Sequence, residues 1–153
     1  MTLITTDSIF TTAEQTCLQA VASTMIPPDA EIPGAGDEAI FARILALSAR
    51  QPGPVRNCIA AIETAAHNHY SCGYIALSTD QQIELLQRLR QQSPLLLGVL
   101  VSVVAASYYE DDRVLISLGY EPRPPFPLGH TVETGDWSLL DPVRSREPFY
   151  RKP

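Results

Sequence analysis

The residues with the greatest capacity for chemistry lie together at positions 67–72, where the sequence reads His-Asn-His-Tyr-Ser-Cys. Imidazole and thiolate groups are zinc ligands, and a cysteine beside a histidine can act as a nucleophile. On a helix, however, His67 and His69 point about 200° apart, and His69 shares a face with Cys72 alone. Two ligands do not complete a zinc site, so we expect a buried or half-exposed histidine pair rather than a metal centre.

Two other groups of reactive side chains have simpler structural interpretations. Glu110-Asp111-Asp112 could chelate a hard cation, but consecutive carboxylates point apart, and three of them favour the start of a helix. Tyr108-Tyr109 could stack on a ligand, yet two tyrosines that end an apolar helix usually pack. The sequence contains no nucleophile elbow, P-loop, dinucleotide fingerprint or haem-attachment motif. We therefore predict no catalytic, cofactor-binding or metal-binding residue in this chain. The alternative is a free-standing small helical enzyme or ligand-binding domain, with a pocket near His69 and Tyr108.

Composition narrows the classes of function. The 153 residues carry 11 Lys and Arg against 17 Asp and Glu, a net charge of −6, which argues against nucleic acid or an anionic membrane as partner. The strongest apolar run, residues 95–106, falls well short of the ~20 residues that cross a bilayer, so no transmembrane segment is expected. Three cysteines without framework spacing indicate reduced thiols. Residues 1–10 lack the basic residue of a secretory signal, so we expect a cytoplasmic chain, periplasmic only if a partner's signal carries it.

The elements that would position these residues are helices. Each predicted helix begins where a capping residue or proline precedes an apolar stripe: after Thr11, at Asp37, near Pro54, after Ser78, at Ser93-Pro94 and near Asp112. This pattern predicts an all-α body over residues 1–119, a compact irregular bundle of five to six helices. The fifth helix is apolar nearly all round, which predicts a central helix enclosed by the others.

Residues 120–153 form a predicted tail of different composition. They contain seven of the 13 prolines, which favours an extended chain, and their last ten residues carry a charge of +3. Aromatic and arginine side chains joined by stiff proline are typical of a protein interface. The anchors we predict are Trp137, Leu140, Arg144, Phe149 and Tyr150. Composition alone leaves a second interpretation open, in which the tail wraps its own body and covers the fifth helix.

Short motifs at both ends of the chain resemble the gluconate 2-dehydrogenase subunit 3 family. The first is Met25-Ile26-Pro27-Pro28-Asp29, followed by Ile32-Pro33-Gly34-Ala35. The second runs from Tyr108-Tyr109-Glu110-Asp111-Asp112-Arg113-Val114 through Leu118-Gly119-Tyr120, and Pro122 to Gly129 is also similar. In the tail, Leu139-Leu140-Asp141-Pro142-Val143-Arg144 and Tyr150-Arg151 resemble members of the same family. The predicted partner-binding set is therefore Trp137, Leu139, Leu140, Asp141, Pro142, Val143, Arg144, Phe149, Tyr150 and Arg151.

The resemblance implies a non-catalytic small subunit of a flavin-dependent sugar or polyol dehydrogenase. In that family, a large catalytic subunit of the glucose–methanol–choline oxidoreductase type binds FAD and oxidises the sugar. The small subunit supports the folding, stability or export of the large one, and some complexes add a cytochrome subunit. The sequence departs from many members by lacking a twin-arginine leader. We thus expect no cofactor in this chain and FAD in its partner.

Overall fold

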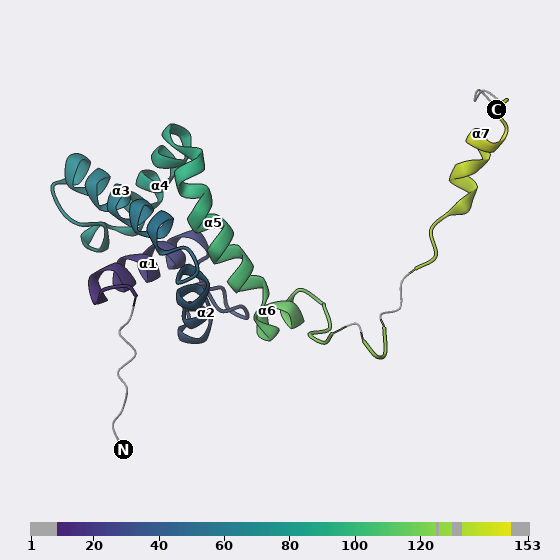
Figure 1. Cartoon of the computed structure of the whole chain (residues 1–153), viewed down its shortest axis with the longest axis horizontal. Helices are drawn as coiled ribbons and strands as arrows, with labels where there is room; N and C mark the ends of the chain where they lie inside the picture. Colours follow the sequence, from purple (N-terminus) through teal and green to yellow (C-terminus); the bar gives the residue numbers. More distant parts are fainter. Residues whose placement is uncertain (1–8, 125, 130–132, 148–153) are drawn as a thin grey trace, which may run out of the picture. The chain divides into compact units, whose positions relative to one another are not determined.

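The computed structural model describes residues 9–124, 126–129 and 133–147. Its helices are α1 (Thr12–Met25), α2 (Glu38–Ser48), α3 (Pro52–Tyr70), η1 (Tyr74–Ala76), α4 (Thr79–Gln92), α5 (Pro94–Tyr109), α6 (Asp112–Ser117), η2 (Trp137–Leu140) and α7 (Asp141–Arg144) (Figure 1). No strand occurs among these residues, which confirms the predicted all-α class. Contacts divide the chain into a first unit, Met1–Pro122, and a second unit, Arg123–Pro153.

The helices begin where local chemistry satisfies their free backbone N–H groups. Thr11 and Glu14 form a capping box at α1, in which the Thr11 N–H donates to the Glu14 carboxylate at 2.7 Å and the Glu14 N–H donates to Thr11 Oγ1 at 3.2 Å. Ser78 and Gln81 form a second box at α4, and the Asp37 side chain caps α2. The predicted caps at Thr11, Asp37 and Ser78 are confirmed. Ser93 makes no side-chain cap hydrogen bond at α5, and α3 already begins at Pro52.

The core of the first unit is formed by α1, α2, α3, α4 and α5, with α5 packed against α2, α3 and α4. In Figure 1, α5 runs from the end of α4 to the start of α6. Its buried face carries Leu97, Leu100, Val103, Val104, Ser107 and Tyr108. Cys17 and Cys58 lie in the same core as free thiols, and burial raises the pKa of Cys58 to about 11.

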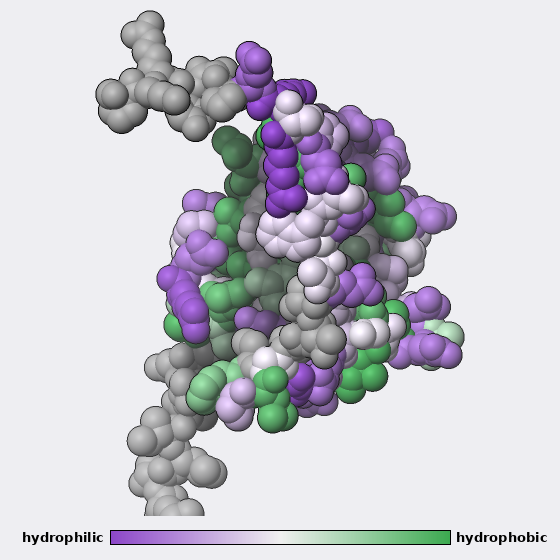
Figure 2. Space-filling model, turned by 90° about the vertical axis from the view of Figure 1, so that its right-hand side faces the viewer, coloured by the Kyte–Doolittle hydropathy of each residue, from purple (hydrophilic) through white to green (hydrophobic). Residues whose placement is uncertain are grey.

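The prediction that α5 is enclosed on all sides is wrong for the described residues. Leu95, Val101 and Tyr109 are exposed, and Val101 keeps half of its surface in contact with solvent. The physical reason is that the neighbouring helices of the first unit pack along one side of α5, so an apolar sequence does not by itself produce burial. Figure 2 shows hydrophobic side chains at the surface, interspersed with hydrophilic ones.

A tight turn between α1 and α2 holds the first of the two sequence motifs. The Ala35 N–H donates to the Ile26 carbonyl at 2.9 Å, and the Asp29 N–H donates to the Ile32 carbonyl at 3.0 Å. A Cβ atom at Gly34 would lie 2.6 Å from the Pro28 nitrogen and 3.0 Å from the Ile26 carbonyl oxygen. The close approach of two backbone segments therefore requires glycine at this position.

Replacing glycine with alanine should have opposite effects at two positions. Gly34→Ala should lower the free energy of unfolding by about 2 kcal/mol, because its Cβ meets rigid backbone. Gly98→Ala, in the interior of α5 with no atom within 4 Å of the new Cβ, should raise it by about 1 kcal/mol. Urea unfolding of both variants measures the two changes. Equal effects of the same sign would contradict the close approach at Gly34.

Candidate functional site

The predicted partner-binding residues of the tail lie on a short helical segment within the second unit. Asp136 caps η2, where its carboxylate accepts from the Ser138 N–H at 3.0 Å. The segment continues directly into α7, and Pro142 occupies the first turn, where its missing N–H costs nothing. The Ser145 N–H donates to the Asp141 carbonyl at 3.0 Å and closes the last turn. The sequence predicted an extended tail, and the structure adds this helical segment to it.

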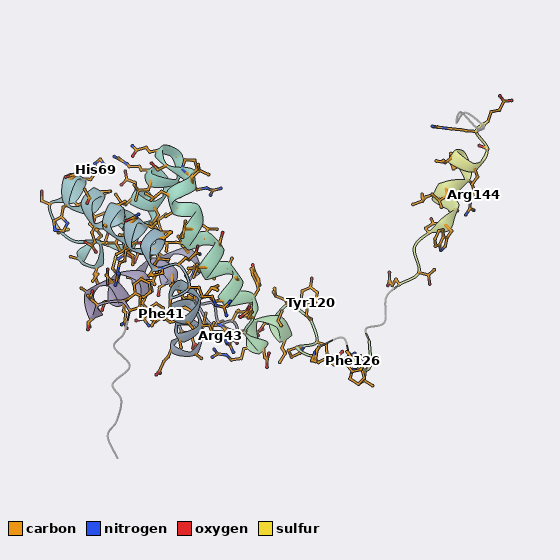
Figure 3. The ribbon with its side chains drawn as sticks, viewed as in Figure 1. Phe41, Arg43, His69, Tyr120, Phe126 and Arg144 are labelled. Atoms are coloured by element: carbon orange, nitrogen blue, oxygen red, sulfur yellow. The ribbon has the colours of Figure 1, made fainter. Side chains whose placement is uncertain are left out.

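The helical segment presents large apolar side chains at its surface. Trp137 is 63% exposed, and Leu139, Leu140 and Val143 are also exposed. Residues three apart eclipse one another along a 3₁₀-helix, so Trp137 and Leu140 share one edge, and Val143 follows one turn later. Arg144, labelled in Figure 3, forms a 3.5 Å ion pair with Asp141 between exposed side chains, which contributes little stability. The remaining predicted anchors, Phe149, Tyr150 and Arg151, lie outside the described residues.

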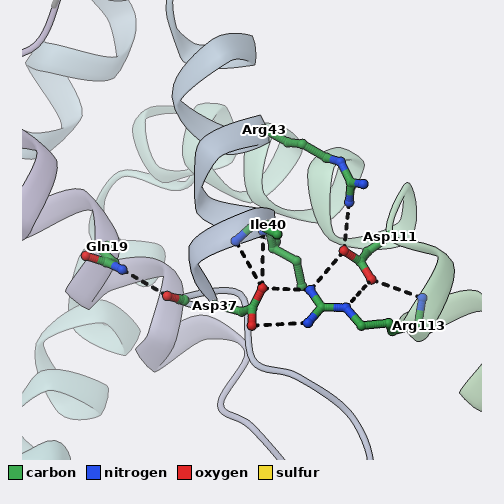
Figure 4. A network of polar contacts seen from close by, with 8 residues as sticks. Gln19, Asp37, Ile40, Arg43, Asp111 and Arg113 are labelled. Atoms are coloured by element: carbon green, nitrogen blue, oxygen red, sulfur yellow. Dashed lines mark hydrogen bonds and ion pairs between the residues drawn. The ribbon is translucent and has the colours of Figure 1, made fainter.

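In the first unit, ion pairs join the second sequence motif to the segment that follows the first motif. The Arg113 guanidinium donates to both Asp37 carboxylate oxygens, at 2.7 and 3.2 Å, and to both Asp111 oxygens, at 2.9 and 3.1 Å. Arg43 from α2 donates to Asp111 at 2.8 Å (Figure 4). We call Asp37, Arg43, Asp111 and Arg113 the ion-pair network. It connects the turn before α2 to the start of α6.

The network is centred on a buried carboxylate. Asp111 is 3% exposed and also caps α6 by accepting from the Arg113 N–H at 3.0 Å. Hydrogen bonding by Arg113 lowers the pKa of Asp111 to about 2, and the same guanidinium lowers the pKa of Asp37. The expectation that the acidic trio starts a helix is confirmed. Sequence reasoning missed the network. The signal that could have indicated it is a pair of opposite charges in each segment, Asp37 with Arg43 after the first motif and Asp111 with Arg113 in the second.

In the described part of the chain, the structure does not bring together the residues of the alternative site near His69 and Tyr108. His69 lies near the end of α3 (Figure 3), at the end of the first unit opposite α6, whereas Tyr108 directly precedes the α5–α6 junction. His67 and His69 are exposed, which corrects the expected burial or half-exposure of this pair, and Cys72 is partly buried. None of these residues lines either of the two cavities found in the first unit. No group of three or more potential metal ligands occurs among the described residues.

A comparison with protein-family models shows which family the chain belongs to. The model of gluconate 2-dehydrogenase subunit 3 matches residues 12–120, which span α1 to α6 and both motifs of the first unit. This chain belongs to that family. No curated protein and no solved structure matches the chain significantly. The predicted resemblance is confirmed, and the gluconate 2-dehydrogenase subunit 3 match ends before the helical segment of the tail.

Membership in the gluconate 2-dehydrogenase subunit 3 family assigns the chain to a hetero-oligomeric dehydrogenase complex, in which it is a subunit. The ion-pair network joins segments near both ends of the matched region. No helix of the described residues has the length and apolarity needed to span a membrane. We next ask what the exposed surfaces of this subunit could bind.

Removing the central carboxylate should destabilise the first unit. Asp111→Ala leaves Arg43 and Arg113 without their buried partner and α6 without its cap, and should lower the free energy of unfolding by about 3 kcal/mol. Asp112→Ala, an exposed neighbour with the same charge change, is the matched control and should cost less than about 1 kcal/mol. Chemical unfolding compares the two. Equal losses would show that the network adds no stability.

Acid should weaken the same network. The folded pKa of Asp111 is about 2 and its ordinary value is 3.8, so its stabilisation is complete above about pH 4 and is lost as the pH falls toward 2. Asp111→Asn has no proton to take up there. Its free energy of unfolding should therefore fall less between pH 4 and pH 2 than that of the wild type, as urea titrations at each pH can measure. Parallel curves would refute this assignment.

Proposed function

We propose that this chain is the non-catalytic small subunit of an FAD-dependent sugar or polyol dehydrogenase. Its partner is a large catalytic subunit of the glucose–methanol–choline oxidoreductase type, which holds FAD and oxidises the substrate. The small subunit supports the folding, stability or export of that partner, and a cytochrome subunit completes some such complexes. The observation that carries this proposal is the match to a family of dehydrogenase subunits over α1 to α6.

The exposed helical segment of the tail supports the proposal. Trp137, Leu140 and Val143 keep much of their apolar surface in water, which is unfavourable by about 25 cal/mol for each Å² left uncovered. Tryptophan and arginine are the side chains that most often dominate binding energy in protein interfaces. Arg144 adds a cation to this segment, in a chain whose net charge is −6. A second protein that covers these side chains would recover their burial energy.

In this proposal, the cellular location of the complex depends on whether the large subunit carries an export signal. We place the complex in the cytoplasm unless an export signal on the large subunit carries both chains to the periplasm. Fractionating cells that express both chains, with antibodies to each, tests this placement.

Deleting residues 130–153 should abolish the complex. The chain is co-expressed with a flavin-binding glucose–methanol–choline-type chain from the same genome, and the two are purified through a tag on the small subunit. The wild type should retain a flavin-containing partner, whereas the truncated chain should stay helical by circular dichroism and lose it. Undiminished recovery of the partner by the truncated chain would contradict the proposal, as would sugar oxidation by the small subunit alone.

Point variants should separate side-chain contacts from tail length. The double variant Trp137→Ala, Leu140→Ala removes two exposed apolar anchors and should weaken binding of the large subunit by roughly a hundredfold, because each anchor contributes about 1–2 kcal/mol. The control Thr134→Ala, Ser145→Ala alters two exposed polar residues on either side and should bind like the wild type. Surface plasmon resonance with the immobilised large subunit measures both affinities.

A further inference from the structure

The first unit contains an apolar groove that its own helices leave open. It has a volume of about 330 Å³ and lies between the C-terminal end of α1 and the helices α4 and α5. The lining residues, which define the α4–α5 groove, are Thr24, Met25, Ile26, Ile83, Leu86, Gln87, Arg90, Leu97, Val101, Val104 and Ala105. Ile83 is 40% exposed and Val101 is 50% exposed, so the groove opens to solvent rather than enclosing a cavity.

The spacing of the lining residues matches one face of each helix. On α4 the lining residues are Ile83, Leu86, Gln87 and Arg90; the last three lie three, four and seven residues after Ile83. On α5 they are Leu97, Val101, Val104 and Ala105; the last three lie four, seven and eight residues after Leu97, which is also the spacing of one helix face. Side chains at such intervals form a continuous stripe, and seven residues of helix extend about 10 Å. The groove therefore has the dimensions to hold two turns of a helix or a short extended segment.

Two polar side chains of the groove, Thr24 and Arg90, differ in whether residues of the first unit form hydrogen bonds with them. Thr24 Oγ1 donates to the Ala20 carbonyl at 2.9 Å and lies 3.0 Å from both the Gln82 side chain and the Tyr74 hydroxyl. The Arg90 side chain has no hydrogen bond or ion pair with any described residue. By contrast, Arg88 on the same helix pairs with Glu84 at 2.7 Å. Arg90 thus offers a cation at the edge of an apolar surface.

This arrangement indicates the chemistry of the occupant. A small polar substrate would need several converging polar groups, and the groove supplies mainly aliphatic walls. A protein segment with apolar side chains would bury those walls, and a carboxylate on it would pair with the Arg90 guanidinium. The net charge of the chain is −6, so a second copy would bring excess negative charge toward its own acidic surface.

We propose that the α4–α5 groove binds an apolar segment of the large catalytic subunit that carries an Asp or Glu, and that this carboxylate pairs with Arg90. The groove is then a second contact surface, separate from the tail segment that contains Trp137. The inference rests on the proposed function, because it names where the first unit receives the same partner. Two contact surfaces on one small subunit would together fix its orientation on the large one.

A first pair of variants tests the apolar wall. In the full-length chain co-expressed with the flavin-binding large subunit, Val101→Asp places a charge in the groove and should weaken binding at least about tenfold. Ala106→Asp makes an apolar-to-acidic change at an exposed position of α5 that does not line the groove, and should bind like the wild type. Thermal melts establish that both variants fold. Equal affinities of the two variants would overturn the inference.

A second pair tests the charge. Arg90→Glu should weaken binding about tenfold, with a smaller dependence on salt than the wild type, because the ion pair is lost. Arg88→Glu makes the same charge change on α4 outside the groove and is the matched control. If Arg88→Glu weakens binding as much as Arg90→Glu, general electrostatics and not a pair at Arg90 explains the effect, and the carboxylate assignment is wrong.

A photo-crosslinking amino acid at position 101 identifies the occupant. The expected product joins position 101 to a peptide of the large subunit that contains apolar residues and a carboxylate. A crosslink to residues 123–153 of the same chain, or to a second copy, would overturn the inference while leaving the family assignment intact. Failure of the wild-type chain to bind the large subunit at all would overturn the proposed function, and with it this inference. Binding by the wild type with unaffected groove variants would overturn the inference alone.

Discussion

The structure depends on how much of α5 its neighbours can cover. This helix carries apolar side chains on nearly every face, and α2, α3 and α4 pack against it in a core that α1 completes. Those helices bury Leu100, Val103 and Val104 but leave Val101 half exposed. The uncovered side of α5 and the adjacent face of α4 make the α4–α5 groove. The helix that organises the core thus also exposes an apolar surface, which we propose is covered by another protein.

The ion-pair network holds together two segments of the first unit that lie far apart in the chain. Apolar contacts are non-directional, whereas the bidentate hydrogen bonds from Arg113 to Asp37 and Asp111 fix the orientation of α6 against the turn before α2. Arg43 supplies a second cation for the buried Asp111, so the carboxylate stays ionised in the core. The network residues all lie within the family match, at residues 12–120, and they serve the architecture of the first unit.

Features determined by neighbouring residues could be predicted from the sequence, and features determined by distant ones could not. The capping box of Thr11 and Glu14 involves residues three apart, and it forms as predicted. The burial of α5 depends on how many helices reach it, so its pattern alone overstated its enclosure. Asp111 and Arg113 are close in sequence, but the network joins them to Asp37 and Arg43, 76 and 68 residues away, and no local pattern predicts that connection. The proline content of the tail predicted an extended chain, but Pro142 in a first turn is compatible with the helix that forms.

We propose that this chain binds the large subunit through two surfaces, the tail segment and the α4–α5 groove, and that the large subunit carries out the reaction. Hydrogen–deuterium exchange of the full-length chain, alone and bound to the flavin-binding large subunit, tests this most directly. We expect slower exchange on binding in residues 137–144 and in the exposed stretches of α4 and α5, with the core of α3 unchanged. Slower exchange confined to residues 67–72, or none anywhere in a verified complex, would contradict the account.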